Sequence, residues 1–416
     1  MLRYVAPAGA PMTVGDLLRW ARSAVSSGDA DARLVHELKQ CFDVRHVIVT
    51  STGRAGMTLL LQAMRRLRPA GRTEVILPAY TCYSVAASIV KAGLRPRIVD
   101  ISPRTLDYIP DALTRLDTSR VLALLTTNLY GLPNDVPFLE AYARERGVFL
   151  VDDAAQAMGA QVAGRASGTW GDAGLFSFDK GKNVSAIDGG VLVIKSDELN
   201  AALVETMRAC ASPGPATSLA HVAKALVYWA LLRPWLYGIP ARIPQLGLGQ
   251  TVFTTDYPLA RPDPVLIALA ATMLPKLPTF TRIRQANAEA LMAELRGADI
   301  DRVEPRTGAT AVYLRLPLLV RDAGLQSPVI RALNAAGIGA TASYPASLAD
   351  VPELQPYLAE PRSAAAGGRD VARRIVTLPT HPFLAAADVR RAGEVLVAAC
   401  AASTLHGTMK DQRATL

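Results

Sequence analysis

The chain has 416 residues, which is more than one small hydrophobic core requires and fits about two to three domains. Half of the residues are hydrophobic and 19% are charged, a globular balance that excludes an intrinsically disordered chain. The 45 basic and 36 acidic side chains leave a formal charge of +9, but the basic residues are dispersed, which favours a basic solvated surface, or a phosphorylated small substrate, over nucleic-acid binding.

Residues 1–45 are predicted to form a helical segment of two short helices, with Thr13 as the N-cap of the first. From residue 46 to about 195, short β-rich runs alternate with helical stretches. Near-continuous apolar strands separated by amphipathic helices indicate a mostly parallel sheet that is covered on both faces, with ligands outside the carboxyl ends of its strands. The predicted strands are HVIVT, EVILPAY, RPRIVDI, RVLALLTTN, GVFLVDD, AGLFSF and GGVLVIK.

The stretch from 211 to 262 is rich in proline and is predicted to be irregular. It contains the most apolar part of the sequence, residues 222–244. Lys224, Arg233 and Pro234 interrupt this part before it reaches the ~20 apolar residues that a transmembrane helix needs. Three interpretations are open for it: a core helix, an element facing a second subunit, or a segment lying on a membrane surface.

The large domain is expected to cover residues 46–262, and a smaller α/β domain is expected over 263–403. The polar residues 404–416 are expected to form a frayed tail. The elements predicted for the smaller domain are a long helix that includes 280–297, followed by a strand, a helix and a terminal helix at 311–320, 328–337 and 387–402.

Three of the predicted strand ends carry polar residues. At the first, the strand HVIVT continues through Ser51, Thr52 and Gly53 directly into a helix. Free N–H groups at a helix start, reached past a glycine, form an anion site that usually takes phosphate. Many ordinary strand-to-helix turns look the same, so the chemistry depends on what lies beside this turn.

The second strand end carries Asp152 and Asp153 after a wholly apolar run. A buried carboxylate is costly unless a cation pairs with it, and a protonated pyridine nitrogen is one such partner. Gln156 follows at the start of the next helix and is expected on the same side. The alternative is a carboxylate that only caps that helix.

The third strand end places Ser177 close to Lys182, which lies five residues later on the loop before the next strand. A hydroxyl beside a phosphate site and an amine on the following loop could hold one phosphorylated aldehyde from two sides. Most lysines are solvated surface groups, and Lys180 is a second candidate beside Lys182.

The order and spacing of these motifs resemble the DegT/DnrJ/StrS family of pyridoxal-phosphate aminotransferases. The resemblance runs from about residue 45 to 200 through NLYGLPND, VDDAAQAMGA and GDAGLFSFDKGKNVSAIDGG, and it resumes in AAGIGATASYP and IVTLPTHP. It implies an aspartate-aminotransferase-like α/β fold of type I, with a large domain built on a mostly parallel mixed sheet and a smaller C-terminal α/β domain. It also implies pyridoxal 5'-phosphate as the cofactor.

The family pattern, carried over residue by residue, gives Lys182 as the lysine that binds the cofactor covalently and places Lys180 at a variable position. Asp153 matches the carboxylate that faces the pyridine nitrogen, where it would keep that nitrogen protonated and make the ring an electron sink. Gln156 matches the residue near the ring hydroxyl. Lys182 would also carry the proton that moves during the reaction.

On the phosphate side, Ser177 matches a phosphate ligand, and Gly53 and Arg54 occupy the phosphate turn. Relatives of this fold type are homodimers in which each subunit completes the active site of the other. The family segment that supplies an asparagine to the partner's phosphate is replaced here by TTDYPLARPDP, which contains Asp256 and Arg261. An aspartate cannot donate to phosphate, so Arg261 is the expected substitute.

Two further positions depart from the family. Cys82 falls where many relatives stack an aromatic ring on the cofactor, and either Tyr83 or Tyr80 replaces that ring or no residue does. The histidine of the family's HLYG motif is Asn128 here. These departures leave the cofactor prediction intact and weaken the prediction of the substrate.

The resemblance therefore predicts an aminotransferase that passes nitrogen from an amino donor, glutamate by family analogy, to a keto or aldehyde acceptor, most simply a nucleotide-linked keto sugar. The alternatives are a sugar dehydratase, which usually lacks the lysine, amination of a lipid-linked or hydrophobic acceptor, and a regulatory protein without turnover. Neither a metal nor nucleic acid is expected. Four widely separated cysteines and a start without a signal-peptide-like apolar stretch predict a cytoplasmic protein.

Overall fold

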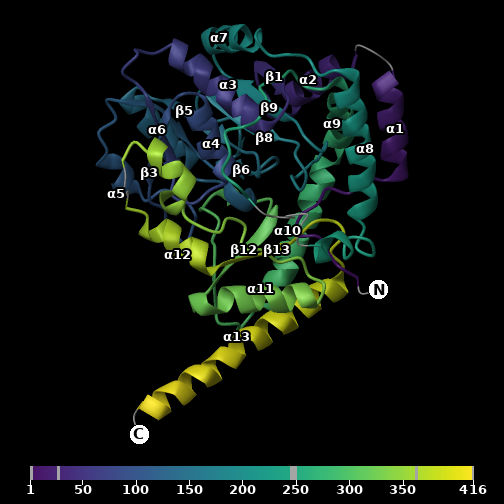
Figure 1. Cartoon of the computed structure of the whole chain (residues 1–416), viewed down its shortest axis with the longest axis vertical. Coiled ribbons are helices and arrows are strands. Elements are labelled where there is room, and N and C mark those ends of the chain that lie inside the picture. The colour runs from purple at the N-terminus through teal and green to yellow at the C-terminus, as the bar shows by residue number, and fades with distance from the viewer. Residues whose placement is uncertain (1–2, 26–28, 244–250, 361–363, 415–416) are drawn as a thin grey trace.

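The computed structural model describes residues 3–25, 29–243, 251–360 and 364–414, with the side chains of the last helix described as far as Ala401. A seven-stranded sheet forms the centre of the larger part of the described chain (Figure 1). Its strands lie in the order β1-β9-β8-β5-β4-β2-β3. Among these described strands, β9 alone runs in the direction opposite to the other six, so the predicted mostly parallel mixed sheet is confirmed.

All seven predicted runs form strands of this sheet. Each has five residues and reads as a nearly continuous apolar run, because a strand covered on both faces has no solvent side. Their bounds are β1 (His46–Thr50), β2 (Glu74–Pro78), β3 (Arg95–Val99), β4 (Val121–Leu125), β5 (Phe149–Asp153), β8 (Ala173–Ser177) and β9 (Gly190–Ile194).

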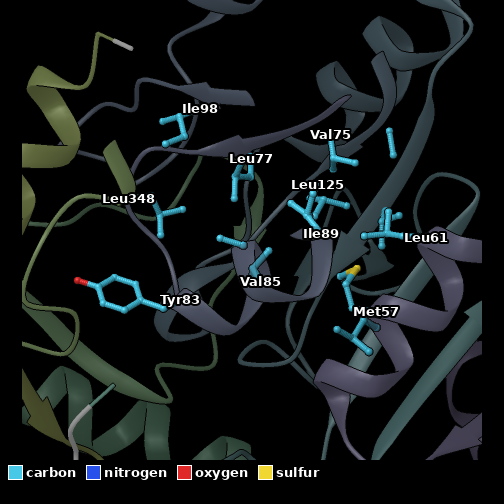
Figure 2. Close-up of a cluster of buried hydrophobic side chains, with 14 of the residues drawn as sticks. Met57, Leu61, Val75, Leu77, Tyr83, Val85, Ile89, Ile98, Leu125 and Leu348 are labelled. Carbon is cyan, nitrogen blue, oxygen red and sulfur yellow. The ribbon is translucent and has the colours of Figure 1, made fainter. Parts of the chain in front are cut away.

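Alternate residues of each strand pack on opposite faces of the sheet. In β2, Val75 and Leu77 join the cluster of one face, while Ile76 joins the cluster of the other. Figure 2 shows the first cluster, where Met57 and Val85 from two helices meet the strands. The helices on this face are α3 (Gly53–Arg66), α4 (Tyr83–Lys91) and α7 (Asp197–Met207), and those on the other are α5 (Pro110–Thr114), α6 (Val136–Arg146), α1 (Val14–Val25), α2 (Asp29–Phe42) and α9 (Pro264–Met273).

The first helix begins as its sequence predicts. The Thr13 hydroxyl accepts from the Asp16 backbone N–H at 3.2 Å, and the Asp16 carboxylate accepts from the Thr13 backbone N–H at 2.6 Å. This reciprocal pair satisfies two donors at the start of α1. Both α1 and α2 pack against α9, which closes this face of the sheet.

The smaller part contains a three-stranded antiparallel sheet in the order β10-β12-β13. Helix α13 packs on α10 and α11 and then extends away from the body (Figure 1). It continues into the segment expected to be a frayed tail and ends at Ala414. The bounds are β10 (Ile300–Arg302), β12 (Arg315–Val320), β13 (Ile375–Pro379), α10 (Leu277–Glu294), α11 (Gln326–Ala335), α12 (Ala366–Arg374) and α13 (Ala386–Ala414).

A third, small sheet joins the two parts. Its strands lie in the order β11-β6-β7, and the first of them follows α10 in the chain, whereas the other two follow β5. Residue 263, where the smaller domain was expected to begin, is the N-cap of α9. The domain limits stay a prediction. The bounds of these strands are β6 (Gln161–Val162), β7 (Arg165–Ala166) and β11 (Ala309–Thr310).

The stretch expected to be irregular contains a helix, α8 (Pro215–Leu231), so that expectation was wrong for these residues. Gly214 and Pro215 begin the helix, and Pro234 follows its end, which explains why the composition looked like a loop. Ala225 alone among the residues of α8 is buried, so a core helix is excluded for this part of the chain. The only described segment long and apolar enough to cross a membrane is Pro264–Glu294, and 56% of its most apolar window is buried inside the protein.

Candidate active site

All six residues predicted for the site line one cavity of about 450 Å³. The cavity lies at the carboxyl ends of β5 and β8, beside the start of α3, which is where a parallel sheet is expected to bind its ligands. The structure therefore brings together segments that are more than a hundred residues apart in the chain. The six are Gly53, Arg54, Asp153, Gln156, Ser177 and Lys182.

The turn between β1 and α3 is held in place by close backbone contact. The Thr52 hydroxyl caps α3 by accepting from the Ala55 N–H at 2.9 Å. A Cβ atom on Gly53 would lie 3.5 Å from the Ser177 hydroxyl oxygen, and one on Gly190 would lie 2.8 Å from the Gly53 backbone nitrogen. The glycine that begins β9 is thus required for the approach of this strand to the turn. The turn presents the first N–H groups of α3 to the cavity beside Ser177.

Asp153 ends β5 and faces the cavity, although its side chain is buried. Its Oδ1 accepts from the Ala155 N–H at 2.9 Å, which is the local capping bond that the sequence left open. Burial raises the pKa of Asp153 from 3.8 to about 6, while the positive charge of Lys182 acts in the opposite direction. This carboxylate is therefore held in a place where its ionised form is poorly stabilised by the chain alone.

Asp152 points to the other side of the strand and does not line the cavity among the residues described. Its carboxylate accepts from four neutral donors, so its role is structural. The donors are Thr126 Oγ1 at 3.0 Å, Asn128 Nδ2 at 2.8 Å, the Gly168 N–H at 2.6 Å and the Trp170 N–H at 3.4 Å.

Asn128, which replaces the family histidine, fixes the end of β5. Its Nδ2 donates to Asp152 Oδ1 and to the Asp153 carbonyl oxygen, both at 2.8 Å. Its Oδ1 accepts from the Asn134 N–H at 2.9 Å. Asn128 also lines the cavity, so it positions Asp153 from a site that the sequence reasoning treated only as a departure.

The two lysines of the loop after β8 differ in exposure. Lys180 is exposed, Lys182 is half-buried, and both line the cavity. The Lys182 backbone N–H donates to the Asp179 carbonyl at 3.2 Å, and the Lys182 carbonyl accepts from Arg284 Nη2 at 3.4 Å. The positive charge of Lys182 favours the ionised form of Asp153, so the two predicted catalytic groups lie close enough to interact electrostatically.

Arg284 is completely buried and forms no ion pair with the residues that the structure describes. It donates to the carbonyls of Gly9 at 2.7 Å and Leu314 at 3.2 Å in addition to that of Lys182. Burial lowers the pKa of Arg284 to about 10, so it is still charged at neutral pH. The lysine loop is thereby tied to the N-terminal segment and to the start of β12. Nothing in the spacing of the sequence pointed to this arginine.

Gln156 connects the cavity to the smaller part of the chain. Its Oε1 accepts from the Tyr130 N–H at 2.9 Å, and its Nε2 donates to the Tyr344 hydroxyl at 2.9 Å. Tyr130 has a backbone φ of 57°, an uncommon value for a residue other than glycine, and this orients its N–H.

Of the three residues weighed for stacking on the cofactor, only Cys82 lines the cavity among the residues described. Its Sγ lies 2.9 Å from the Ser84 hydroxyl. The Tyr80 hydroxyl donates to the Ala342 carbonyl at 3.1 Å, and the Tyr83 hydroxyl donates to the Ala346 carbonyl at 3.2 Å. Both tyrosines hold the smaller part of the chain and leave the thiol facing the cavity.

The cavity carries polar atoms that have no partner among the described residues. The hydroxyls of Thr81 and Thr127 are buried, unpaired and part of the lining. Asp188 also lines the cavity, and burial raises its pKa to about 6. With Arg54 and Lys182, this lining fits an anionic ring compound that bears several polar substituents, as pyridoxal phosphate does.

The expected partner-binding loop lies outside the cavity of its own chain. Arg261 is exposed and is not among the described residues that line the cavity. Its backbone N–H donates to the Ala211 carbonyl at 2.9 Å. Asp256 is likewise exposed. Thr251 and Val252, which precede this loop, do line the cavity, and the sequence did not indicate this.

The mixed seven-stranded sheet with a cavity at its carboxyl edge is the architecture of the pyridoxal-phosphate enzymes of fold type I. The chain belongs to the DegT/DnrJ/EryC1/StrS aminotransferase family, whose model matches residues 15–227 and 260–397.

Individual relatives agree with this assignment. The chain is 26% identical over 357 residues to UDP-N-acetyl-3-dehydro-alpha-D-glucosamine 3-aminotransferase of Acidithiobacillus ferrooxidans, covering 85% of this chain and 83% of that protein. Two solved structures share the fold. The aminotransferase TlmJ from Streptoalloteichus hindustanus has a TM-score of 0.78 at 24% identity, covering 96% of this chain and 99% of its own. GDP-4-keto-6-deoxy-D-mannose-3-dehydratase of E. coli has a TM-score of 0.76 at 19% identity, covering 95% and 100%.

Proposed function

We propose that this aminotransferase passes the amino group of glutamate to the keto group of a nucleotide-linked sugar. The observation that carries the proposal is the meeting of Lys182 and Asp153 in one cavity of a chain that belongs to this family. The acceptor class is supported by the relative that acts on a UDP-linked keto sugar and matches most of both chains.

Pyridoxal phosphate supplies an electron sink when it is bound. Asp153 would hold the proton on the ring nitrogen, since a cation beside this carboxylate relieves the cost of its burial. Lys182 would hold the aldehyde end of the cofactor and would move a proton at the α carbon of the donor. Gln156, whose amide is fixed by Tyr130 and Tyr344, would lie beside the ring hydroxyl.

The turn between β1 and α3 would hold the phosphate together with Ser177. Ser177 would donate its hydroxyl, and the N–H groups of Gly53 and Arg54 at the start of α3 would donate as well. These donors would offset only part of the negative charge of the phosphate, so a second subunit is expected to supply a further cation. We place Arg261 of a partner chain there, in a cytoplasmic homodimer with shared sites.

A dehydratase shares this fold, so the architecture alone does not choose between elimination and amino transfer. Lys182 favours amino transfer, because the dehydratases of this family usually lack the lysine, whereas a transaminase needs an amine that can release and accept a proton at the α carbon.

The test follows the amino group through the two half-reactions of transamination. Glutamate alone should remove the visible absorbance of the purified yellow protein and release a stoichiometric amount of 2-oxoglutarate. UDP-, dTDP- and GDP-linked keto sugars are then offered, with lipid-linked ketones as a second panel, and the aminated product is identified by mass spectrometry. Loss of glutamate nitrogen only to a lipid-linked ketone would refute the acceptor. No reaction with any amino donor would refute the transaminase.

A further inference from the structure

The inward side of helix α8 is mixed: Val222, Ala225 and Trp229 pack on the core, and polar groups lie beside them. Ser218 Oγ donates to Asp263 Oδ1 at 3.1 Å, and His221 Nδ1 lies 2.8 Å from Asp263 Oδ2. Further along the same side, the Tyr228 hydroxyl accepts from the Ala10 N–H at 3.3 Å. In a typical surface helix the apolar residues are confined to the side that faces the core, whereas α8 also carries them elsewhere.

The outer side of α8 is apolar and continues past the helix. Residues at helical spacing, Leu219, Leu226 and Val227, are 70%, 45% and 55% exposed. Of the twelve large hydrophobic side chains exposed in the described chain, six lie within this short part, which we call the α8 face: Leu219, Leu226, Val227, Trp235, Ile239 and Ile243. An exposed apolar area gathered in this way marks an interaction surface.

The charge around the α8 face is of one sign. The sequence contains no Asp or Glu from residue 206 to 255. The helix and the residues after it contain Lys224, Arg233 and Arg242, and the Arg233 guanidinium lies 4.8 Å from the centroid of the Trp229 ring. Basic side chains beside apolar ones, with an exposed tryptophan at the end of the helix, form the pattern of segments that lie on anionic membranes.

Two alternatives for the α8 face, contact with a second copy of the chain and insertion across a membrane, fit less well. A second copy related by two-fold symmetry would set the same basic stretch against itself, without an acidic residue to compensate. A transmembrane position would require about 30 Å of helix, whereas the 17 residues of α8 span about 25 Å and are fixed along one side to Asp263 and Ala10.

We infer that the α8 face binds the surface of a bilayer that contains anionic lipid. Leu226, Val227 and Trp235 enter the boundary between headgroups and acyl chains, while Lys224 and Arg242 contact the phosphates. The inference is independent of the acceptor, because the face is separate from the cavity that holds Lys182.

The experiment is flotation of the full-length holoenzyme with vesicles of phosphatidylcholine alone or mixed with phosphatidylglycerol. The protein should float with the anionic vesicles at low salt and stay behind with the neutral ones. Lys224→Ala and Arg242→Ala should each weaken partition about fivefold. The double variant Leu226→Ser, Val227→Ser should weaken it by about tenfold or more. The matched control is Val204→Ser on α7, which changes an equally exposed apolar side chain outside the face and should bind as the parent does.

Retained visible absorbance and glutamate half-reaction establish that each variant is folded. Equal flotation of the double serine variant and the parent would overturn the inference, as would a parent that floats with neither vesicle. Light scattering gives the remaining outcome: if the double variant dissociates an oligomer and the parent ignores both vesicles, the α8 face joins subunits and the membrane assignment is wrong.

Discussion

Replacing Asp153 by Asn is expected to stabilise the cofactor-free protein while it removes turnover. The pKa of this carboxyl is raised from 3.8 to about 6 because the side chain is desolvated. Between these two values the folded chain keeps a proton that the unfolded chain has released. Stability therefore falls as the pH rises through this interval, and the loss is complete above the folded pKa.

The magnitude follows from the size of that rise in pKa, which corresponds to about 3 kcal/mol of unfolding free energy above pH 6. Asparagine is neutral at every pH and escapes this cost, and its side-chain oxygen can still accept from the Ala155 N–H. The gap in stability between Asp153→Asn and the parent should thus be small near pH 4 and should approach about 3 kcal/mol near pH 8.

The assay is thermal unfolding of both cofactor-free proteins across this pH range, followed by turnover of the reconstituted enzymes. Asp152→Asn is the matched control. An amide there places a donor against hydroxyl, amide and backbone donors, so this variant should be less stable than the parent. A gap for Asp153→Asn that fails to widen with pH would refute the raised pKa. Turnover near that of the parent would refute the role of Asp153 at the ring nitrogen.

Three further outcomes are expected. Borohydride should fix the cofactor to Lys182, with Lys180→Ala keeping both colour and label; a label on Lys180 would reverse the assignment. Gly190→Ala should lower both the melting temperature and the retention of cofactor, because its Cβ would come within 2.8 Å of the Gly53 backbone, and an unchanged affinity would contradict this contact. Mixed Lys182→Ala and Arg261→Ala subunits should regain activity through one intact shared site. A fully active monomer would exclude shared sites, and an inactive proven heterodimer would exclude Arg261.

The sequence predicts the large sheet well because parallel strands are buried on both faces. Such strands appear as short apolar runs that need no knowledge of their neighbours, and all seven runs are strands in the structure. The polar residues at their carboxyl ends are conspicuous for the same reason. Since these ends share one edge of the sheet, residues as distant as Gly53 and Lys182 could be assigned to one cavity.

What the sequence does not predict depends on contacts that exist only after folding. Arg284 looks like any arginine on a helix, and its burial follows from three backbone carbonyls of distant segments. Asn128 holds Asp153 through a carbonyl, which leaves no pattern in the spacing. Helix α8 was predicted to be irregular because prolines flank it, and apolar residues on both its inner and outer sides hide the pattern from which helical faces are inferred.

The two neighbouring aspartates at the end of β5 have different roles, one in stability and one in function. One step along β5 turns Asp152 into the protein, where four donors offset part of the cost of its burial, and turns Asp153 into the cavity, where one backbone N–H does so. A chain selected for stability alone would have no reason to keep the second carboxylate ionised. A cation bound beside Asp153, such as the protonated ring nitrogen of the cofactor, would remove that cost. The cofactor therefore explains why Asp153, the less stable of the two carboxylates, is buried.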